Sequence, residues 1–115
     1  MNTCLFCRIV SKSIATHFVF EDNQCICIED IQPQAPMHLL VIPKQHIATL
    51  NDISSSQDES LIGHMFSIVT SMAKSYGYAE SGYRTIFNCN QDGGQSVYHL
   101  HLHVLGGRPL NWPPG

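Results

Sequence analysis

Hydrophobic periodicity divides the chain into one long helical segment and several short alternating segments. Between residues 60 and 76, apolar side chains recur every three or four positions, while Ser60, His64 and Lys74 fall on the opposite face. The preceding run Ser-Ser-Ser-Gln-Asp-Glu at 54–59 supplies N-cap and first-turn acid signals, and Gly77 predicts the end of the helix. The expected apolar face consists of Leu61, Ile62, Met65, Phe66, Ile68, Val69, Met72, Ala73 and Tyr76.

The shorter apolar runs predict strands. Residues 17–20 and 25–28 flank the turn signal Glu-Asp-Asn and predict a hairpin, and runs 38–42 and 83–87 predict two further strands. Residues 4–10 are typical of a short helix. The order of these elements predicts a single α+β domain over residues 1–115, with a mostly antiparallel sheet of about five strands, a short N-terminal helix and one long helix covering a face.

Near the C-terminus, three histidines alternate with aliphatic residues in the run His-Leu-His-Leu-His-Val-Leu at 99–105. Successive side chains of a strand point to opposite faces, so the run predicts a half-buried strand that presents His99, His101 and His103 on one face. The simpler explanation is a solvated polar face. Such a face usually mixes Lys, Glu and Thr, however, whereas this one is uniformly histidine.

Imidazole serves proteins as a metal ligand, a general acid or base, and a nucleophile. Alternate residues of a strand lie roughly 6.6 Å apart, so two of these side chains could approach one zinc ion. The first and third lie roughly 13 Å apart by the same rise, and both cannot reach that ion comfortably. At least one of the three histidines is therefore expected to have another role.

Composition narrows the class of protein. The 115 residues are 43% hydrophobic and 13% charged, with a formal net charge of −3 and no basic stripe, which argues against disorder and against nucleic-acid binding. No apolar run approaches the roughly 20 residues of a membrane span, and no secretion signal is visible. Five cysteines, an odd number, favour a reducing compartment over a disulfide framework, so a cytoplasmic location is expected.

The pair Cys4-x-x-Cys7 supplies half of a zinc site. On a short helix it is equally compatible with two buried small apolar side chains or with a redox pair. A zinc site would need two further ligands from elsewhere in the chain.

Several sequence segments form an ordered set. They are Phe20-Glu21-Asp22, Asp30-Ile31, Pro33-Gln34-Ala35-Pro36, His38, Val41-Ile42-Pro43-Lys44, Gly-Gly-Gln-Ser-Val-Tyr-His-Leu-His-Leu-His-Val-Leu-Gly-Gly at 93–107, and Trp112-Pro113-Pro114-Gly115. A lone His-x-His motif is weak evidence for any family. This ordered set, however, resembles the histidine-triad nucleotide-binding family, in its Hint-like branch, over nearly the whole chain. The resemblance implies a two-fold homodimer that binds purine nucleotides and hydrolyses the P–N bond of nucleoside 5′-phosphoramidates or adenylylated amines, without an organic cofactor.

The resemblance also assigns catalytic roles. The family nucleophile corresponds to His101, which would form a nucleotidyl-histidine intermediate that water then cleaves. Its orienting acceptor would be the backbone carbonyl of His99. His103 would contact the phosphate or leaving group and help to deliver a proton to the amine, and His38 would complete the relay.

The resemblance gives candidate nucleotide contacts as well. Ile28 and Ile31 would line the base pocket, and the carboxylate of Asp30 would accept hydrogen bonds from the ribose hydroxyls. A glycine-rich turn before the histidine run would present donors to the phosphate, although read alone it is an ordinary turn. The further phosphate and ribose candidates are Asn88, Gly94, Gln95, Ser96 and Val97, in addition to His101 and His103.

Some members of the family hold a structural zinc ion with positions that correspond to Cys4, Cys7, His46 and His99. The family also implies that Trp112, in the C-terminal tail, reaches the neighbouring subunit's site. Two alternative functions remain at this point: a dinucleoside polyphosphate hydrolase of the related Fhit-like branch, and a nucleotide-binding scaffold with incidental hydrolysis. The Trp-Pro-Pro-Gly ending and the Gly-Gly pair after the histidines favour the phosphoramidase.

Overall fold

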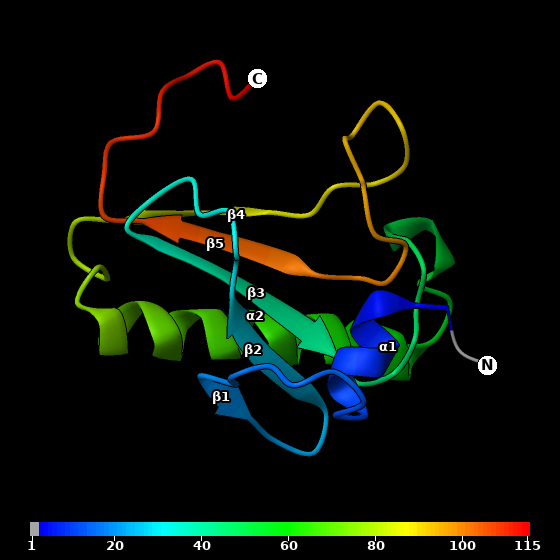
Figure 1. Cartoon of the computed structure of the whole chain (residues 1–115). Helices are drawn as coiled ribbons and strands as arrows, with labels where there is room; N and C mark the ends of the chain where they lie inside the picture. The colour runs from blue at the N-terminus through cyan, green and yellow to red at the C-terminus, as the bar shows by residue number, and fades with distance from the viewer. Residues whose placement is uncertain (1–2) are drawn as a thin grey trace.

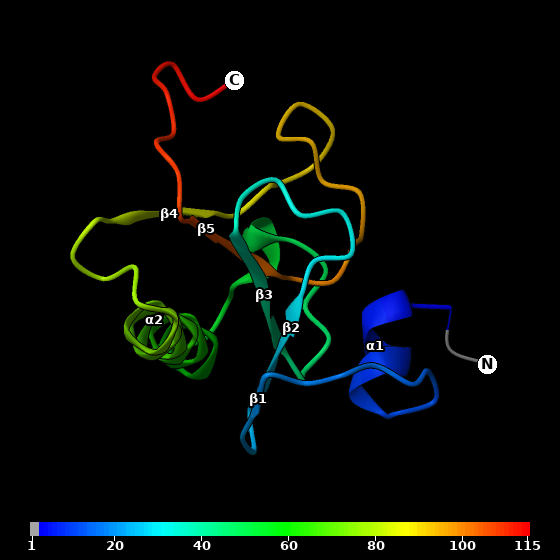
Figure 2. The same ribbon diagram turned by 60° about the vertical axis from the view of Figure 1, so that its left-hand side comes forward.

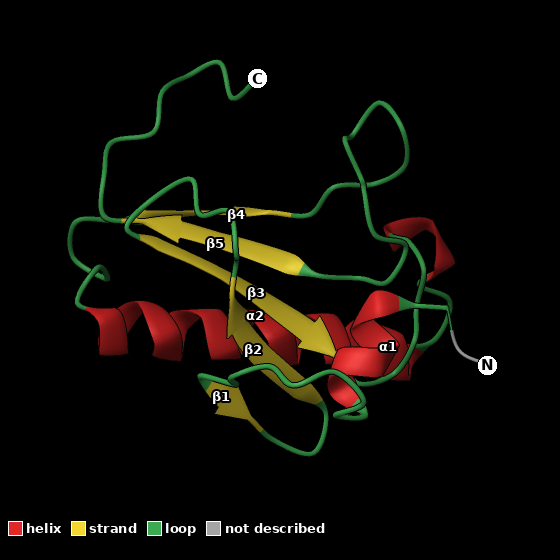
Figure 3. Cartoon of the chain, viewed as in Figure 1, coloured by secondary structure: helices red, strands yellow, loops and turns green. Residues whose placement is uncertain are grey.

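The computed structural model describes residues 3–115, which form a five-stranded antiparallel sheet with helices on its two sides (Figures 1 and 2). The sheet order is β1-β2-β3-β5-β4, and Figure 3 shows the long irregular segment that joins β4 to β5. The elements are α1 (Leu5–Val10), β1 (Phe20–Glu21), β2 (Cys25–Glu29), β3 (Met37–Pro43), the 3-10 turn η1 (Leu50–Asp52), α2 (Ser56–Tyr76), β4 (Tyr83–Ile86) and β5 (Leu102–Gly106). The predicted α+β class, long helix and short N-terminal helix are confirmed.

The central strand β3 is buried along its whole length and separates two apolar layers. Leu39 and Val41 face the layer under α2, whereas Leu40 and Ile42 face the layer under α1, as the period of two requires. Burial of each such side chain contributes about 1.5–3 kcal/mol. Because both faces of the sheet are covered at its centre, both sets of β3 side chains are buried. The strand is therefore a nearly continuous apolar run in the sequence.

The helix α2 begins and ends at residues that the sequence indicates. The side chain of Ser55 caps it by accepting a hydrogen bond from the amide of Asp58, and Gly77 ends it at a φ of 84°. One predicted core residue differs: Phe66 is 39% exposed and makes an edge contact with Phe87. It follows the fully buried Met65 by one position, which turns it about 100° around the helix toward solvent.

Two strand predictions are wrong in extent. The run 17–20 contributes only Phe20 to β1, although the amide of Val19 still donates to the carbonyl of Cys27 in β2. The histidine run 99–105 becomes strand only at Leu102. The amide of Leu100 donates instead to the carbonyl of Ile47, so this part of the run is held by a loop rather than by a neighbouring strand.

Within residues 3–115, no helix combines the length and the apolar character needed to cross a bilayer.

Candidate active site and metal centre

Strand pairing between β3 and β5 brings two of the predicted catalytic histidines together. His103 lies opposite Leu40 in the register, and His38 lies two residues before Leu40 on the same face of β3. As a result, Nε2 of His38 is 2.9 Å from Nδ1 of His103, and it also lies 3.4 Å from a carboxylate oxygen of Asp30. Burial lowers the pKa of His38, and burial together with His101 and His38 lowers the pKa of His103 to about 4.

His101 lies just before β5, and the backbone fixes the position of its proton. Nδ1 of His101 is 2.8 Å from the carbonyl oxygen of His99, and because a carbonyl only accepts, Nδ1 carries the proton. The lone pair of the neutral ring is then on Nε2. Burial lowers the pKa of His101, and Phe6 packs edge-on against its ring with centroids 4.9 Å apart.

His101 and His103 line a pocket of about 360 Å³ between α1 and the sheet. Its wall contains two acidic positions, Glu29 and Asp30, beside a largely apolar surface. The lining residues are Leu5, Phe6, Ile9, Ile28, Glu29, Asp30, Ile31, Gln32, Leu40, Ser96, Val97, His101 and His103. Pockets of this size and mixed character are typical of small-molecule sites. Most of the predicted nucleotide contacts thus lie together, including Ile31, which is 95% exposed at the rim.

Three predicted nucleotide contacts lie outside the lining of this pocket. Gln95 is buried, and its side chain accepts from the amide of Asn90 and donates to the carbonyls of Ala48 and Val97. Asn88 donates to the carbonyl of Gly93, and Gly94 adopts a φ of 77°. These residues shape the turn that carries Ser96 and Val97 to the pocket.

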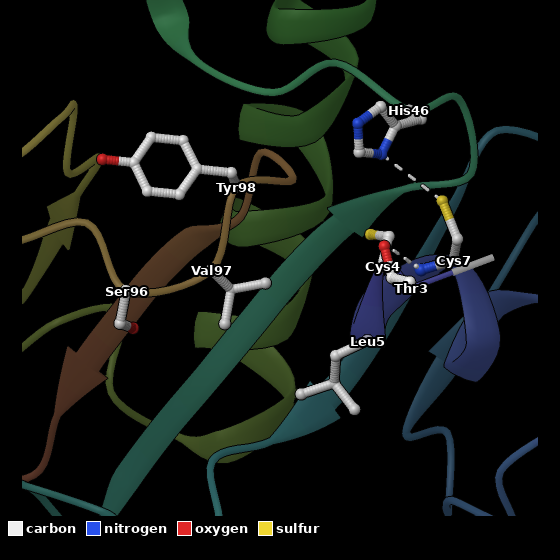
Figure 4. A pocket seen from close by; sticks show the side chains of 8 residues that line it. All are labelled: Thr3, Cys4, Leu5, Cys7, His46, Ser96, Val97 and Tyr98. Carbon is white, nitrogen blue, oxygen red and sulfur yellow. Dashed lines mark hydrogen bonds between the residues drawn. The ribbon is translucent and has the colours of Figure 1, made fainter.

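The predicted metal ligands converge from three segments. Nδ1 of His99 lies 3.3 Å from Sγ of Cys4, 3.5 Å from Sγ of Cys7 and 3.1 Å from Nδ1 of His46. Cys7 Sγ is 3.4 Å from Nδ1 of His46, and Figure 4 shows these two side chains pointing toward each other from α1 and from the loop after β3. A second pocket, of about 640 Å³, lies beside them.

This donor set fits a zinc ion. Tetrahedral zinc with ordinary bond lengths separates two nitrogens by about 3.3 Å and two sulfurs by about 3.8 Å. The four ligand atoms lie within 4.8 Å of one another, the nitrogen–nitrogen separation of 3.1 Å is close to the first value, and the longest nitrogen–sulfur separation, 3.5 Å, lies between the two. His99 is fully buried, and its Nε2 is 2.7 Å from the carbonyl oxygen of Pro43, so this nitrogen donates and Nδ1 is left unprotonated toward the cluster.

His64 and Trp112 lie apart from the two sites. His64 contacts a carboxylate oxygen of Asp22 at 2.6 Å, near the thiol of Cys25, and burial raises the pKa of that thiol to about 12. Trp112 is 80% exposed in the C-terminal tail and lies 5.9 Å from the guanidinium of Arg84.

Sequence reasoning missed two contacts at the active site. It identified Phe6 only as part of a short helix and did not single out Gln34, whose backbone amide donates to Nδ1 of His38. The three-residue spacing of Phe6 and Ile9 in α1 gave a weak signal for a buried Phe6. No local pattern indicates the contact made by a backbone amide.

The fold and the site define a class of small α+β proteins in which two histidines of one segment face an open pocket and a third, from the paired strand, contacts one of them. Comparison with known proteins makes this assignment specific. The family model described as scavenger mRNA decapping enzyme C-term binding matches residues 3–109. A purine nucleoside phosphoramidase from Escherichia coli (strain K12) is 44% identical over 106 residues, which cover 92% of this chain and 88% of that protein.

An uncharacterized HIT-like protein from Synechococcus elongatus is 47% identical over 111 residues, 96% of each chain. The crystal structure of a HIT family hydrolase from Legionella pneumophila Philadelphia 1 superposes with a TM-score of 0.94 at 50% identity, covering 98% of this chain and all of that one. The chain therefore belongs to the histidine-triad (HIT) family of hydrolases.

Proposed function

We propose that this protein hydrolyses the P–N bond of purine nucleoside 5′-phosphoramidates through a covalent nucleotidyl intermediate on His101. The observation that carries the proposal is the bond from Nδ1–H of His101 to the carbonyl of His99, which leaves the Nε2 lone pair free beside the pocket. The similarity to a phosphoramidase of Escherichia coli supports the reaction class.

The pocket suits a nucleotide because its surface changes character along its length. Phe6, Ile9, Ile28 and Leu40 are buried apolar residues that provide a surface for a flat base. The carboxylate of Asp30 is a double acceptor that suits two neighbouring ribose hydroxyls. Ser96 and Val97, at the turn before the histidines, lie where a phosphate would approach His101.

In the first step, Nε2 of His101 attacks phosphorus as a neutral nucleophile, which adds no negative charge near the phosphate oxygens. The N–P bond to His101 forms as the P–N bond to the amine breaks. His103, beside His101 in the pocket, donates a proton to the departing amine, so that the amine leaves neutral. The negative charge that His103 gains is balanced by the positive charge that the His101 ring gains when its Nε2 bonds to phosphorus.

In the second step, water attacks the nucleotidyl-His101 phosphorus. His103, which has just lost its proton, accepts one from this water, and the N–P bond to His101 breaks. The products are the nucleoside monophosphate and the free enzyme, with both rings returned to their starting protonation states.

The test is His101→Ala with an adenosine 5′-phosphoramidate as substrate and AMP as a binding probe. We expect hydrolysis to fall by at least about 10³-fold while AMP affinity changes little. Hydrolysis at the wild-type rate by this variant would refute the proposed nucleophile. Comparing wild-type rates on AMP-amine, GMP-amine and diadenosine polyphosphate substrates separates a phosphoramidase from a dinucleoside polyphosphate hydrolase, and AMP binding without cleavage would favour a scaffold.

We also propose that Cys4, Cys7, His46 and His99 bind a structural zinc ion. Such an ion would join α1, the loop after β3 and the segment before His101 without contacting the phosphorus. Metal analysis of protein purified without added zinc tests this proposal, and we expect about one zinc per chain. A clear absence of zinc would count against it.

A two-fold homodimer completes the proposal. Strand β4 is one of the two edge strands of the sheet formed by residues 3–115, and it is longer than the two-residue β1, so its outer edge can pair with a second copy. The partly exposed Phe66 lies near this edge through its contact with Phe87. Light scattering tests this part of the proposal: we expect the mass of two chains, and the mass of one chain would count against the dimer. In such a dimer, Trp112 of the exposed tail is the candidate contact to the neighbouring subunit's site.

A further inference from the structure

A backbone amide determines which nitrogen of His38 carries the proton. The N–H of Gln34, in the loop between β2 and β3, lies 3.0 Å from Nδ1 of His38. An amide N–H only donates, so Nδ1 must accept, and the neutral ring carries its proton on Nε2. The lowered pKa of His38 favours that neutral ring.

The proton on His38 in turn determines the state of His103. Nε2–H of His38 faces Nδ1 of His103 at 2.9 Å, and two N–H groups cannot face each other at that distance. Nδ1 of His103 therefore accepts, and its proton is on Nε2. His101 has the opposite tautomer, with its proton on Nδ1, so the two rings that line one pocket differ in tautomer because a backbone carbonyl holds His101 and the side chain of His38 holds His103.

The loop that carries Gln34 is held by the segment after β5. The guanidinium of Arg108 donates from Nε to the carbonyl of Gln34 over 2.8 Å and from Nη1 to the carbonyl of Pro109 over 3.0 Å. Gly107 brings the chain close: it has a φ of 97°, and an added Cβ would lie 2.8 Å from Cβ of Pro36. Arg108 thus holds the same residue, Gln34, whose amide contacts His38.

We propose that Arg108 is a positioning residue. By holding the carbonyl of Gln34, it keeps the Gln34 amide against His38 and so keeps the proton of His103 on Nε2, facing the pocket. The catalytic consequence rests on the proposed function: His103 can protonate the departing amine only from Nε2, because Nδ1 is occupied by His38. The tautomer assignment itself holds whatever reaction the protein performs.

The primary experiment is a two-dimensional ¹H–¹⁵N spectrum of the full chain, labelled with ¹⁵N-histidine at neutral pH. The ¹⁵N shifts distinguish protonated from unprotonated ring nitrogens. In the wild type we expect the proton on Nε2 for His38 and His103 and on Nδ1 for His101. In Arg108→Ala we expect the shifts of His38 and His103 to move toward a mixture of tautomers while those of His101 stay unchanged.

Arg84→Ala is the matched control. Arg84 also holds the C-terminal segment, through the carbonyls of Leu110 and Asn111, but it does not contact Gln34. A second pair of variants tests the amide directly: Gln34→Pro removes the donor, whereas Gln34→Ala keeps it. We expect mixed tautomers in Gln34→Pro and wild-type spectra in both Arg84→Ala and Gln34→Ala. Should Gln34→Pro fail to fold, Arg108→Ala still provides the test.

Kinetics supply a second readout. Arg108→Ala should lower kcat about five- to tenfold for an alkylamine leaving group, which needs protonation, with little change in KM or in the rate for a weakly basic aromatic amine. Wild-type ring shifts for His38 and His103 in Arg108→Ala would overturn the inference, as would a proton on Nδ1 of His103 in the wild type. An equal decrease in kcat for the alkylamine and the aromatic amine would also refute the positioning role of Arg108. Failure of the wild type to cleave any phosphoramidate would instead refute the proposed function and leave the spectra interpretable.

Discussion

The five cysteines provide a quantitative test of the structure and of the zinc proposal together. Cys25 and Cys27 are fully buried in β2, and burial raises the pKa of each thiol to about 12. At pH 8 the thiolate fraction of such a group is about 10⁻⁴, against about 10⁻¹ for an ordinary thiol with a pKa near 9, so the smaller thiolate fraction alone slows reaction with a disulfide reagent roughly 10³-fold. Steric protection in the apolar layer slows it further.

The assay counts the thiols that react with a coloured disulfide reagent under three conditions. With zinc bound we expect one reactive thiol, Cys89, which is only partly buried. After removal of the metal with a chelator we expect three, because Cys4 and Cys7 are no longer ligands. In denaturant we expect all five.

A matched control is Cys89→Ser, which should lower every count by one. Four or five rapidly reacting thiols in the native protein would refute the burial of Cys25 and Cys27. A count of three that added zinc does not reduce would refute metal binding by Cys4 and Cys7. The two outcomes are independent, so the packing of the sheet and the metal site are tested separately.

Three further predictions concern stability. Leu39→Ala removes a fully buried side chain from the central strand and should cost about 2–5 kcal/mol in urea unfolding, whereas a cost below 1 kcal/mol would contradict the packing. The hydrogen bond from the Ser54 amide lowers the pKa of Asp58, so this carboxylate stabilises the fold above its ordinary pKa and loses that effect as pH falls through the lowered value. Asp58→Asn should therefore lower the urea midpoint at pH 7 and lower it progressively less as pH falls below the ordinary carboxyl pKa, and an equal decrease across this pH series would argue against a role for the charge. Gly107→Ala places a side chain at positive φ against Pro36 and should lower Tm through a cost of about 1–3 kcal/mol, so an unchanged Tm would contradict that close approach.

The sequence predicted α2 well because the signals that determine a helix lie within the helix and in the residues next to it. Its apolar face repeats every three to four residues, and its N-cap serine and terminal glycine stand next to it in the chain. It predicted β3 for a similar reason, since a strand buried on both faces is a continuous apolar run. Phe66 shows the limit, because periodicity marks the apolar stripe but not where its edge meets solvent.

The histidine run shows a different limit. Alternation correctly placed His103 on a strand, but it predicted one uniform face for three residues that have three environments. His99 is fully buried among the candidate metal ligands, His101 is held by a backbone carbonyl, and His103 pairs with His38. Alternation determines which way side chains point and carries no information about what lies opposite them.

What the sequence by itself determined is the inventory: the helices and strands, the histidines and cysteines, and, by resemblance, the class of reaction. Only the tertiary structure decided how these parts act on one another. Cys4 meets His99 across 95 positions and Arg108 meets Gln34 across 74, contacts that no local pattern records. The physical reason is that periodicity and propensity act over a few residues, whereas a ligand set or a proton's position depends on atoms that only the folded sheet and its loops bring within about 3 Å.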